Sequence, residues 1–149
     1  MGWFNYYGLI AVCVVMLPNI FCAIFDKTAF ENKIENKFLL VFEQIGRIGC
    51  VVFMTCNIPY TYLGFWFESA LLVYLIVGGV LLLAYCLGWV VFGKSKSLVK
   101  TLWLSITPTI LFLFCGIMIV SAPLILCSIL FGVGHIGVNY KNYQISKNI

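Results

Sequence analysis

Residues 102–140, LWLSITPTILFLFCGIMIVSAPLILCSILFGVGHIGVNY, form an apolar run that is too long for a single membrane crossing. A helix rises about 1.5 Å per residue, so this run would extend well beyond a hydrocarbon core about 30 Å thick. The tripeptide Ser121-Ala122-Pro123 is the natural place for a break. The run therefore predicts two membrane spans, at residues 102–120 and 124–140.

The composition of the whole chain is that of a membrane protein. Of its 149 residues, 63% are hydrophobic and 9% are charged, whereas soluble domains contain about 25% charged residues. So few charges cannot build a water-facing surface. The chain contains no long polar segment that could form a second domain, so residues 1–149 are predicted to form one transmembrane domain.

Three further apolar runs precede this one, at residues 7–25, 38–59 and 69–92. The second is expected to end at Pro59, because the residue before a proline is biased away from helix. Glu68 suits the start of the third, since an acid in the first turn complements the helix dipole. The predicted fold class is therefore an all-α, polytopic membrane bundle of five transmembrane helices.

Two details refine this prediction. Pro18, inside the first span, removes a backbone donor and predicts a kink. Between the first two spans, Phe30, Ile34 and Phe38 recur every four residues with charges between them. This spacing predicts a short amphipathic segment at the membrane interface.

The lysines predict which side of the membrane each loop faces. All of them lie between spans one and two, between spans three and four, or after span five: Lys27, Lys33, Lys37, Lys94, Lys96, Lys100, Lys141 and Lys147. Basic residues favour the cytoplasmic side. Every lysine falls inside if the N-terminus is outside and the C-terminus is inside, and a four-helix topology would lose this agreement.

The second span contains an unusual pair of charges. Arg47 is the only arginine of the chain, and Glu43 lies four residues before it. On a helix the two share a face, with the acid on the N-terminal side, which is the better order for pairing. An unpaired charge at the bilayer centre costs from about 3 to more than about 10 kcal/mol, so such residues are candidates for a functional site.

Polar side chains of the other spans lie at a similar depth when residues are counted from the cytoplasmic ends. At about 1.5 Å per residue, most fall roughly 7–14 Å below that boundary. Ser105 and Tyr85 belong to this predicted layer. The candidate substrate-binding or ion-binding residues are Asn19, Glu43, Gln44, Arg47, Thr107 and His135.

Two interpretations of this layer stay open. In the first, it lines a polar cavity open to the cytoplasm, where Glu43 accepts a cation or proton, His135 exchanges protons and Arg47 pairs with Glu43 or with an anionic headgroup. In the second, Glu43 and Arg47 neutralise each other and the layer is a closed network that fixes the helix register. Asn19 and Thr107 fit packing hydrogen bonds better than ligand contacts, and a structural hydrogen bond is favoured for His135.

The sequence contains no motif that is typical of an enzyme or of a metal site. A phosphate loop, a nucleophile elbow and an HExxH sequence are all missing, and no cofactor is predicted. The seven cysteines lie in apolar runs without a CxxC, so they are interpreted as small apolar residues, not as a metal site or a disulfide relay. The net charge of +4 is interpreted as lysine anchoring at anionic lipid headgroups, not as nucleic-acid binding.

The segment Glu43-Gln44-Ile45-Gly46-Arg47 and the end His135…Tyr140-Lys141-Asn142 resemble short multi-span membrane proteins of Gram-positive bacteria. This resemblance implies a multi-pass protein of a bacterial cytoplasmic membrane and brings no particular activity.

Three hypotheses for the function follow. The first is a small transporter or ion- or proton-coupled carrier, expected to be a homo-oligomer because five helices leave little room for a full path. The second is a structural or assembly partner of another membrane protein, using the glycine faces of spans two, three and five. The third is a lipid-modifying membrane enzyme using His135 and Glu43, and an enzyme is the least favoured of the three.

Overall fold

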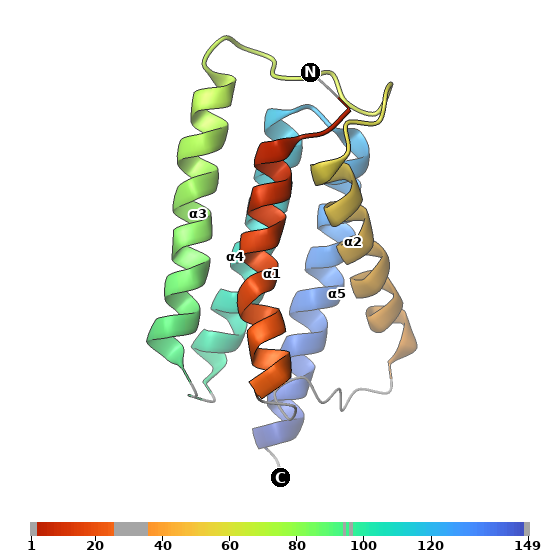
Figure 1. The fold of residues 1–149 in the computed structure, drawn as a ribbon. Coiled ribbons are helices and arrows are strands. Elements are labelled where there is room, and N and C mark those ends of the chain that lie inside the picture. The colour runs from red at the N-terminus through yellow and green to blue at the C-terminus, as the bar shows by residue number, and fades with distance from the viewer. Residues whose placement is uncertain (1–2, 26–35, 94, 96, 148–149) are drawn as a thin grey trace.

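The computed structural model describes residues 3–25, 36–93, 95 and 97–147. It confirms the predicted all-α fold: the described part of the chain forms five helices, each long and apolar enough to cross a membrane (Figure 1). They are α1 (Tyr6–Phe25), α2 (Lys37–Thr55), α3 (Ala70–Phe92), α4 (Leu98–Met118) and α5 (Ala122–Lys147).

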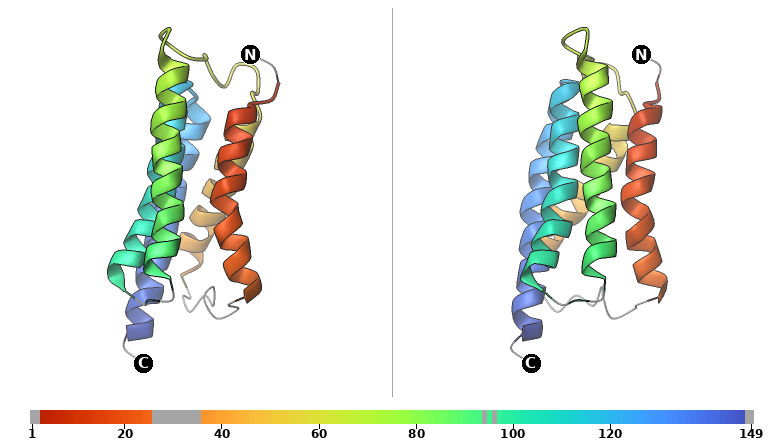
Figure 2. Two further views of the ribbon diagram at one scale, coloured as in Figure 1. Left: turned by 60° about the vertical axis from the view of Figure 1, so that its left-hand side comes forward. Right: turned by 90° about the vertical axis from the view of Figure 1, so that its left-hand side faces the viewer.

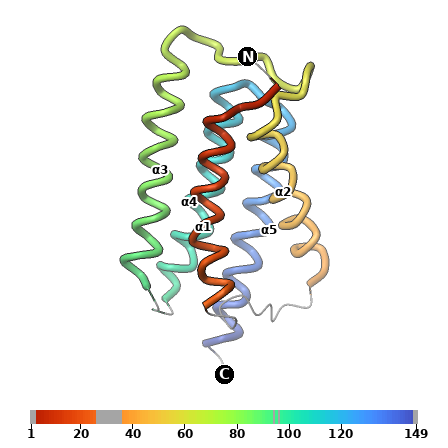
Figure 3. The backbone as a smooth tube through the Cα atoms, viewed as in Figure 1, coloured from red at the N-terminus to blue at the C-terminus, as the bar shows by residue number. Residues whose placement is uncertain are grey.

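The chain runs up and down the bundle, as the tube in Figure 3 shows, so that the N-terminus and the C-terminus lie at opposite ends. We call these the N-terminal end and the lysine end. The described lysines Lys37, Lys100, Lys141 and Lys147 all belong to helix segments at the lysine end. Phe30 and Ile34 of the predicted amphipathic segment lie outside the described residues, as do Lys27, Lys33, Lys94 and Lys96. Phe38, the third apolar residue of that segment, belongs to the first turn of α2.

The helices follow one another around the bundle in the order α1, α2, α5, α4, α3, and α3 closes the ring against α1. The packing of α2 on α5 is the most extensive, and α1 makes much sparser contacts with its two neighbours. In both views of Figure 2, α1 stands apart from α5. The bundle is therefore tight along α2, α5, α4 and α3 and loose around α1.

Local hydrogen bonds explain where the helices begin and end. The Asn5 side chain accepts a hydrogen bond from the Gly8 amide at 3.1 Å and so caps α1. Ser97 caps α4 by accepting from the Lys100 amide at 3.2 Å, which starts that helix before the predicted boundary at residue 102. Helix α4 ends at Met118 and α5 begins at Ala122, so the chain breaks next to the predicted tripeptide 121–123.

Two other helix ends differ from the predicted ones. Helix α2 ends at Thr55, before Pro59, because the chain there pairs with the N-terminal segment: the Asn5 amide donates to the Thr55 carbonyl and the Asn57 amide to the Trp3 carbonyl. Helix α5 continues past Tyr140 to Lys147. Its last turns are polar and extend it beyond the apolar run that the sequence marks.

Most of the hydrophobic core fills the half of the bundle toward the N-terminal end, and Tyr85 extends it into the other half. The side chains on α1 that are buried all precede Pro18, and α1 continues as helix through that proline to Phe25. They pack in one cluster with Cys50, Met54, Tyr74, Leu111, Phe112, Cys115, Met118, Ile119, Leu124 and Phe131, among others. Apolar side chains thus fill most of this half, where the buried polar residues Asn5, Thr55, Asn57, Ser121 and Ser128 are also found, whereas Glu43 lies in the other half.

Candidate functional site

Two glycines bring the backbones of α2 and α5 into contact. A Cβ atom on Gly134 would lie 2.3 Å from the backbone nitrogen of Glu43, and a Cβ atom on Gly46 would lie 2.3 Å from that of Phe131. Only glycine permits such an approach, which is how small residues bring membrane helices together. The contact fixes the depth and orientation of the side chains next to it, which include Glu43 and His135.

Glu43 is the centre of the polar cluster at this contact. Its Oε1 atom accepts hydrogen bonds from Nη2 of Arg47 and from Nδ1 of His135, the latter at 2.9 Å. An ionised carboxylate can only accept, so the proton between Glu43 and His135 is assigned to Nδ1. The Glu43 side chain is 8% exposed, against 20% for His135 and 40% for Arg47.

The imidazole of His135 is held on both sides by its own helix. The Phe131 ring stacks on it, with centroids 4.7 Å apart and planes 16° from parallel, while Nδ2 of Asn139 lies 3.3 Å from each ring nitrogen. Phe112 of α4 meets Phe131 edge-on at 5.6 Å. Phe112 and Phe131 belong to the apolar core, so the polar cluster lies directly against the edge of that core. Asn139 was missed by the sequence analysis, although its spacing of four residues from His135 was a usable signal.

Arg47 lies on the face of α2 that is turned toward the bundle. Arg47 shares one stripe of α2 with Glu43, Cys50 and Met54, whose spacings of four, three and seven residues place them on the same helix face. All three of those residues are buried. The opposite face of α2 is apolar and exposed, through Val41, Ile45, Ile48 and Val52. Arg47 is thus a partly accessible cation on an otherwise buried stripe.

Asn19 and Tyr85 form a second polar contact, between α1 and α3. The Tyr85 hydroxyl donates to Oδ1 of Asn19 at 3.1 Å, and Nδ2 of Asn19 donates to the Val15 carbonyl at 3.3 Å. This hydrogen bond lies beyond Pro18, where no described side chain of α1 is buried. It is a polar link across the loosely packed part of the bundle, separate from the hydrogen bonds of Glu43.

Gln44 and Thr107 lie apart from both contacts. The Gln44 side chain is exposed on α2. Thr107 is buried, and its hydroxyl donates to the Trp103 carbonyl of its own helix at 2.7 Å. Ser105 donates in the same way to Thr101. Of the six candidate residues, the structure therefore joins Glu43, Arg47 and His135 directly, and it places Asn19, Gln44 and Thr107 elsewhere.

Comparisons of the chain with known protein families, with curated proteins and with solved structures give no match. The site must therefore be interpreted from its own geometry. Within residues 3–25, 36–93, 95 and 97–147, no three His, Cys, Asp or Glu side chains gather as a metal site would require. The cluster can hold a proton and an anion, because it combines a carboxylate, an imidazole and a guanidinium within hydrogen-bonding distance.

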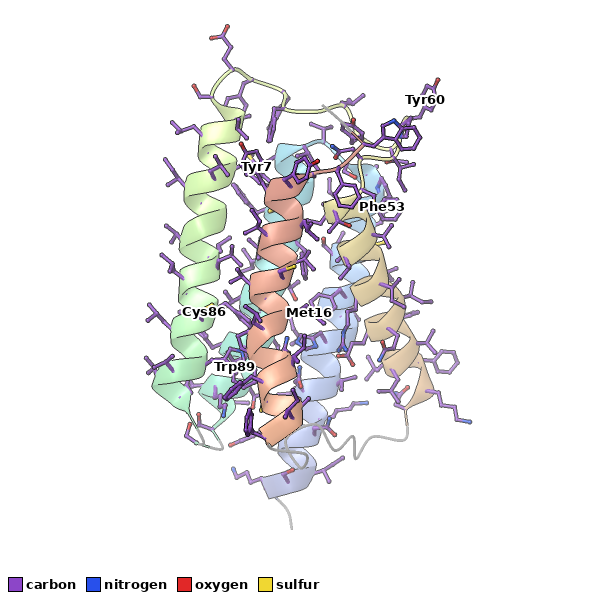
Figure 4. The ribbon with its side chains drawn as sticks, in the orientation of Figure 1. Tyr7, Met16, Phe53, Tyr60, Cys86 and Trp89 are labelled. Carbon is purple, nitrogen blue, oxygen red and sulfur yellow. The ribbon has the colours of Figure 1, made fainter. Side chains whose placement is uncertain are left out.

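A shallow pocket of about 510 Å³ opens at the N-terminal end, in the loop between α2 and α3. Tyr60, labelled in Figure 4, projects from this loop with its side chain fully exposed. Among the described residues, the pocket is lined by uncharged side chains only: Pro59, Tyr60, Tyr62, Leu63, Gly64 and Phe65. It lacks the acid, base and cation that the cluster around Glu43 brings together.

Proposed function

We propose that this protein is a small proton-coupled membrane carrier in which Glu43 and His135 exchange the coupled proton. The observation that supports this proposal is the 2.9 Å contact between Glu43 and His135, made between two helices that are apolar enough to cross a membrane. Ionisable residues at such positions are costly and typically mark a path for ions or protons. Histidine is suited to that role because its charge changes between about pH 5 and pH 8.

The packing of the bundle is consistent with access from one side. The apolar core and the Phe112–Phe131 pair close the half toward the N-terminal end, while α1 packs loosely in the half that holds the cluster. With the proposed orientation, N-terminus outside and C-terminus inside a bacterial cytoplasmic membrane, the cluster exchanges protons with the cytoplasm. For the proton to reach the other side of the membrane, the protein requires a second conformation or a second subunit. The proposal therefore includes a homo-oligomer.

Proton movement in proteoliposomes tests the proposal. A pH-sensitive dye trapped inside reports protons that enter with a solute added outside, and the solutes form a panel of small cations, anions and neutral molecules. We expect at least one solute to drive proton entry with the native protein, and Glu43→Gln and Arg47→Ala to lower that rate about tenfold or more. Gln44→Ala is the matched control on the same helix, because Gln44 lies outside the cluster, and it should leave the rate unchanged.

Two results would reject this function. One is the lack of solute-driven proton entry with the native protein, provided that it is folded in the vesicles. The other is a rate that stays the same in Glu43→Gln and Arg47→Ala.

A second candidate function, assembly with another membrane protein, is favoured by one feature of α3. The glycines of α2 and α5 mostly lie in contacts inside the bundle, but a Cβ atom on Gly79 would meet no atom of the described residues within 4 Å. Ile76, Val80 and Leu83 beside it are exposed, so a further helix can approach the backbone there. A photo-crosslinking residue at position 79 should capture a specific membrane partner in native membranes if this function holds, and only lipid adducts if it does not.

A further inference from the structure

Arg47 retains hydrogen-bonding capacity that Glu43 does not use. A guanidinium carries five N–H donors, and the hydrogen bond it makes with the described residues is the one from Nη2 to Glu43. Its side chain is 40% exposed, although Cys50 and Met54 on the same stripe are completely buried. Because Arg47 lies on the inward-facing stripe of α2, its remaining donors require water or an anion there, since leaving them unsatisfied in a membrane is costly.

The charges around Arg47 define which anion fits. Glu43 and Arg47 cancel each other, and His135 adds one positive charge when it is protonated. From α3, the facing titratable group is Tyr85, which is neutral at physiological pH. On α4, Lys100 lies in the first turn and donates to the Gly93 carbonyl near the lysine end. The cluster thus has a net charge of zero with neutral His135 and of plus one with protonated His135.

The surroundings of His135 accommodate both of these charge states. When the ring is neutral, the Asn139 amide nitrogen can donate to the unprotonated ring nitrogen, which it reaches at 3.3 Å. When the ring is protonated, a flip of the same amide presents its oxygen to the new N–H group. Glu43 accepts from Nδ1 in both states. Neither state leaves a ring nitrogen without a partner.

We propose that the open side of Arg47 binds one small monoanion with an oxyanion group, a carboxylate or a phosphodiester, when His135 carries its second proton. This inference rests on the proposed carrier function and names its substrate class: one proton and one monoanion enter together, so that the loaded site is neutral. A dianion would leave the loaded site with a negative charge inside the membrane. A guanidinium is the side chain best matched to such oxyanions, because it can donate two parallel hydrogen bonds.

The chain is well suited to a direct test, since it contains a single arginine and a single histidine. Protein labelled with ¹⁵N only at arginine and histidine therefore gives signals from Arg47 and His135 alone. The native protein, in neutral detergent micelles, is titrated with sodium acetate at about pH 5.5 and about pH 8. Sodium chloride at equal ionic strength is the control for screening, and the variant Gln44→Ala is the control for the neighbouring helix surface.

We expect acetate to shift the Arg47 guanidinium signal with saturation, and to bind at least about fivefold more tightly at the lower pH. In Arg47→Lys the His135 signal should respond to acetate at higher concentrations only, and in Gln44→Ala it should respond as in the native protein. Equal shifts with chloride, or equal apparent affinity at the two pH values, would overturn the proposal. The native protein carries the decisive comparison, so the result does not depend on the stability of a variant.

A second arm identifies the source of the oxyanion. The same protein is placed in nanodiscs of phosphatidylcholine alone or of phosphatidylcholine with phosphatidylglycerol. If the Arg47 signal differs between the two lipids before acetate is added, the site is assigned to a lipid headgroup. If the signal is the same in the two lipids and responds to acetate in both, the site is assigned to a free solute. Binding in micelles needs no gradient. If the protein binds the anion but proteoliposomes show no proton entry, only the carrier function is rejected. If proton entry is driven only by neutral or cationic solutes, only the anion site is rejected.

Discussion

Gly134 lies against the backbone of Glu43 so closely that a Cβ atom on the glycine would sit 2.3 Å from the Glu43 nitrogen. The next residue along α5, His135, then reaches the Glu43 carboxylate. The close approach of the two helices and the polar contact are therefore parts of one arrangement. A change that separates α2 from α5 should weaken both.

Gly134→Ala should accordingly destabilise the protein. The added methyl group forces the two backbones apart, and overpacking of this kind costs about 1–3 kcal/mol. Gly79→Ala is the matched control, since no atom in the described part of the chain lies within 4 Å of the added atom and alanine is favoured over glycine in a helix by about 0.5–1 kcal/mol. Unfolding in mixed micelles measures both variants. Equal stability of the two would contradict the close approach of α2 and α5.

The pairing of Glu43 with Arg47 predicts a strong coupling between them. Glu43→Gln leaves Arg47 without its counter-charge. Removing one partner of a fully buried pair lowers the free energy of unfolding by about 3–5 kcal/mol. Because Arg47 is 40% exposed, we expect a loss of about 1–3 kcal/mol here. The loss of stability in the double variant Glu43→Gln with Arg47→Gln should be smaller than the sum of the two single losses by about 1 kcal/mol or more. A double-mutant cycle of unfolding free energies checks this. Additive losses would show that the two charges do not interact.

The sequence predicts the depth of these side chains in the membrane, but not which neighbouring helix each of them faces. Depth in the membrane follows from residue counting, and it correctly places Glu43, Arg47 and His135 near one another. Rotation about the helix axis does not follow from counting. Asn19 faces Tyr85 of α3, Gln44 is exposed, and Thr107 bonds within its own helix, so residues at similar depths do not form one layer.

The sequence does not predict the order in which the helices follow one another around the bundle. The sequence predicts five spans from the lengths of the apolar runs and from Ser121-Ala122-Pro123, but neither feature specifies that α2 packs on α5 and not on α3. The glycines at 46 and 134 carry part of that signal, since each sits on the face that meets the other helix. Threonine and serine are poor guides, because they readily satisfy their hydroxyls on the carbonyl four residues earlier.

The hydrogen bond between Tyr85 and Asn19 should control the mobility of α1 beyond Pro18. Tyr85→Phe removes the donor, and side-chain hydrogen bonds between membrane helices contribute about 0.6 kcal/mol on average. Amide exchange in residues 19–25 should therefore become about threefold faster. Tyr6→Phe is the control, because that side chain is 70% exposed. Unchanged exchange in Tyr85→Phe would mean that other contacts hold this part of α1.

The orientation of the bundle is open to a direct test with single cysteines in a chain whose seven natural cysteines are replaced by serine or alanine. Tyr60 is fully exposed in the loop at the N-terminal end, and Lys147 ends α5 at the lysine end. If basic residues place the lysine end in the cytoplasm, a membrane-impermeant maleimide added to intact cells should label Tyr60→Cys and should label Lys147→Cys only after the membrane is opened. The reverse pattern would invert the topology and would place the polar cluster nearer the outer face, so that the proton and anion of the proposed carrier would be taken up from outside.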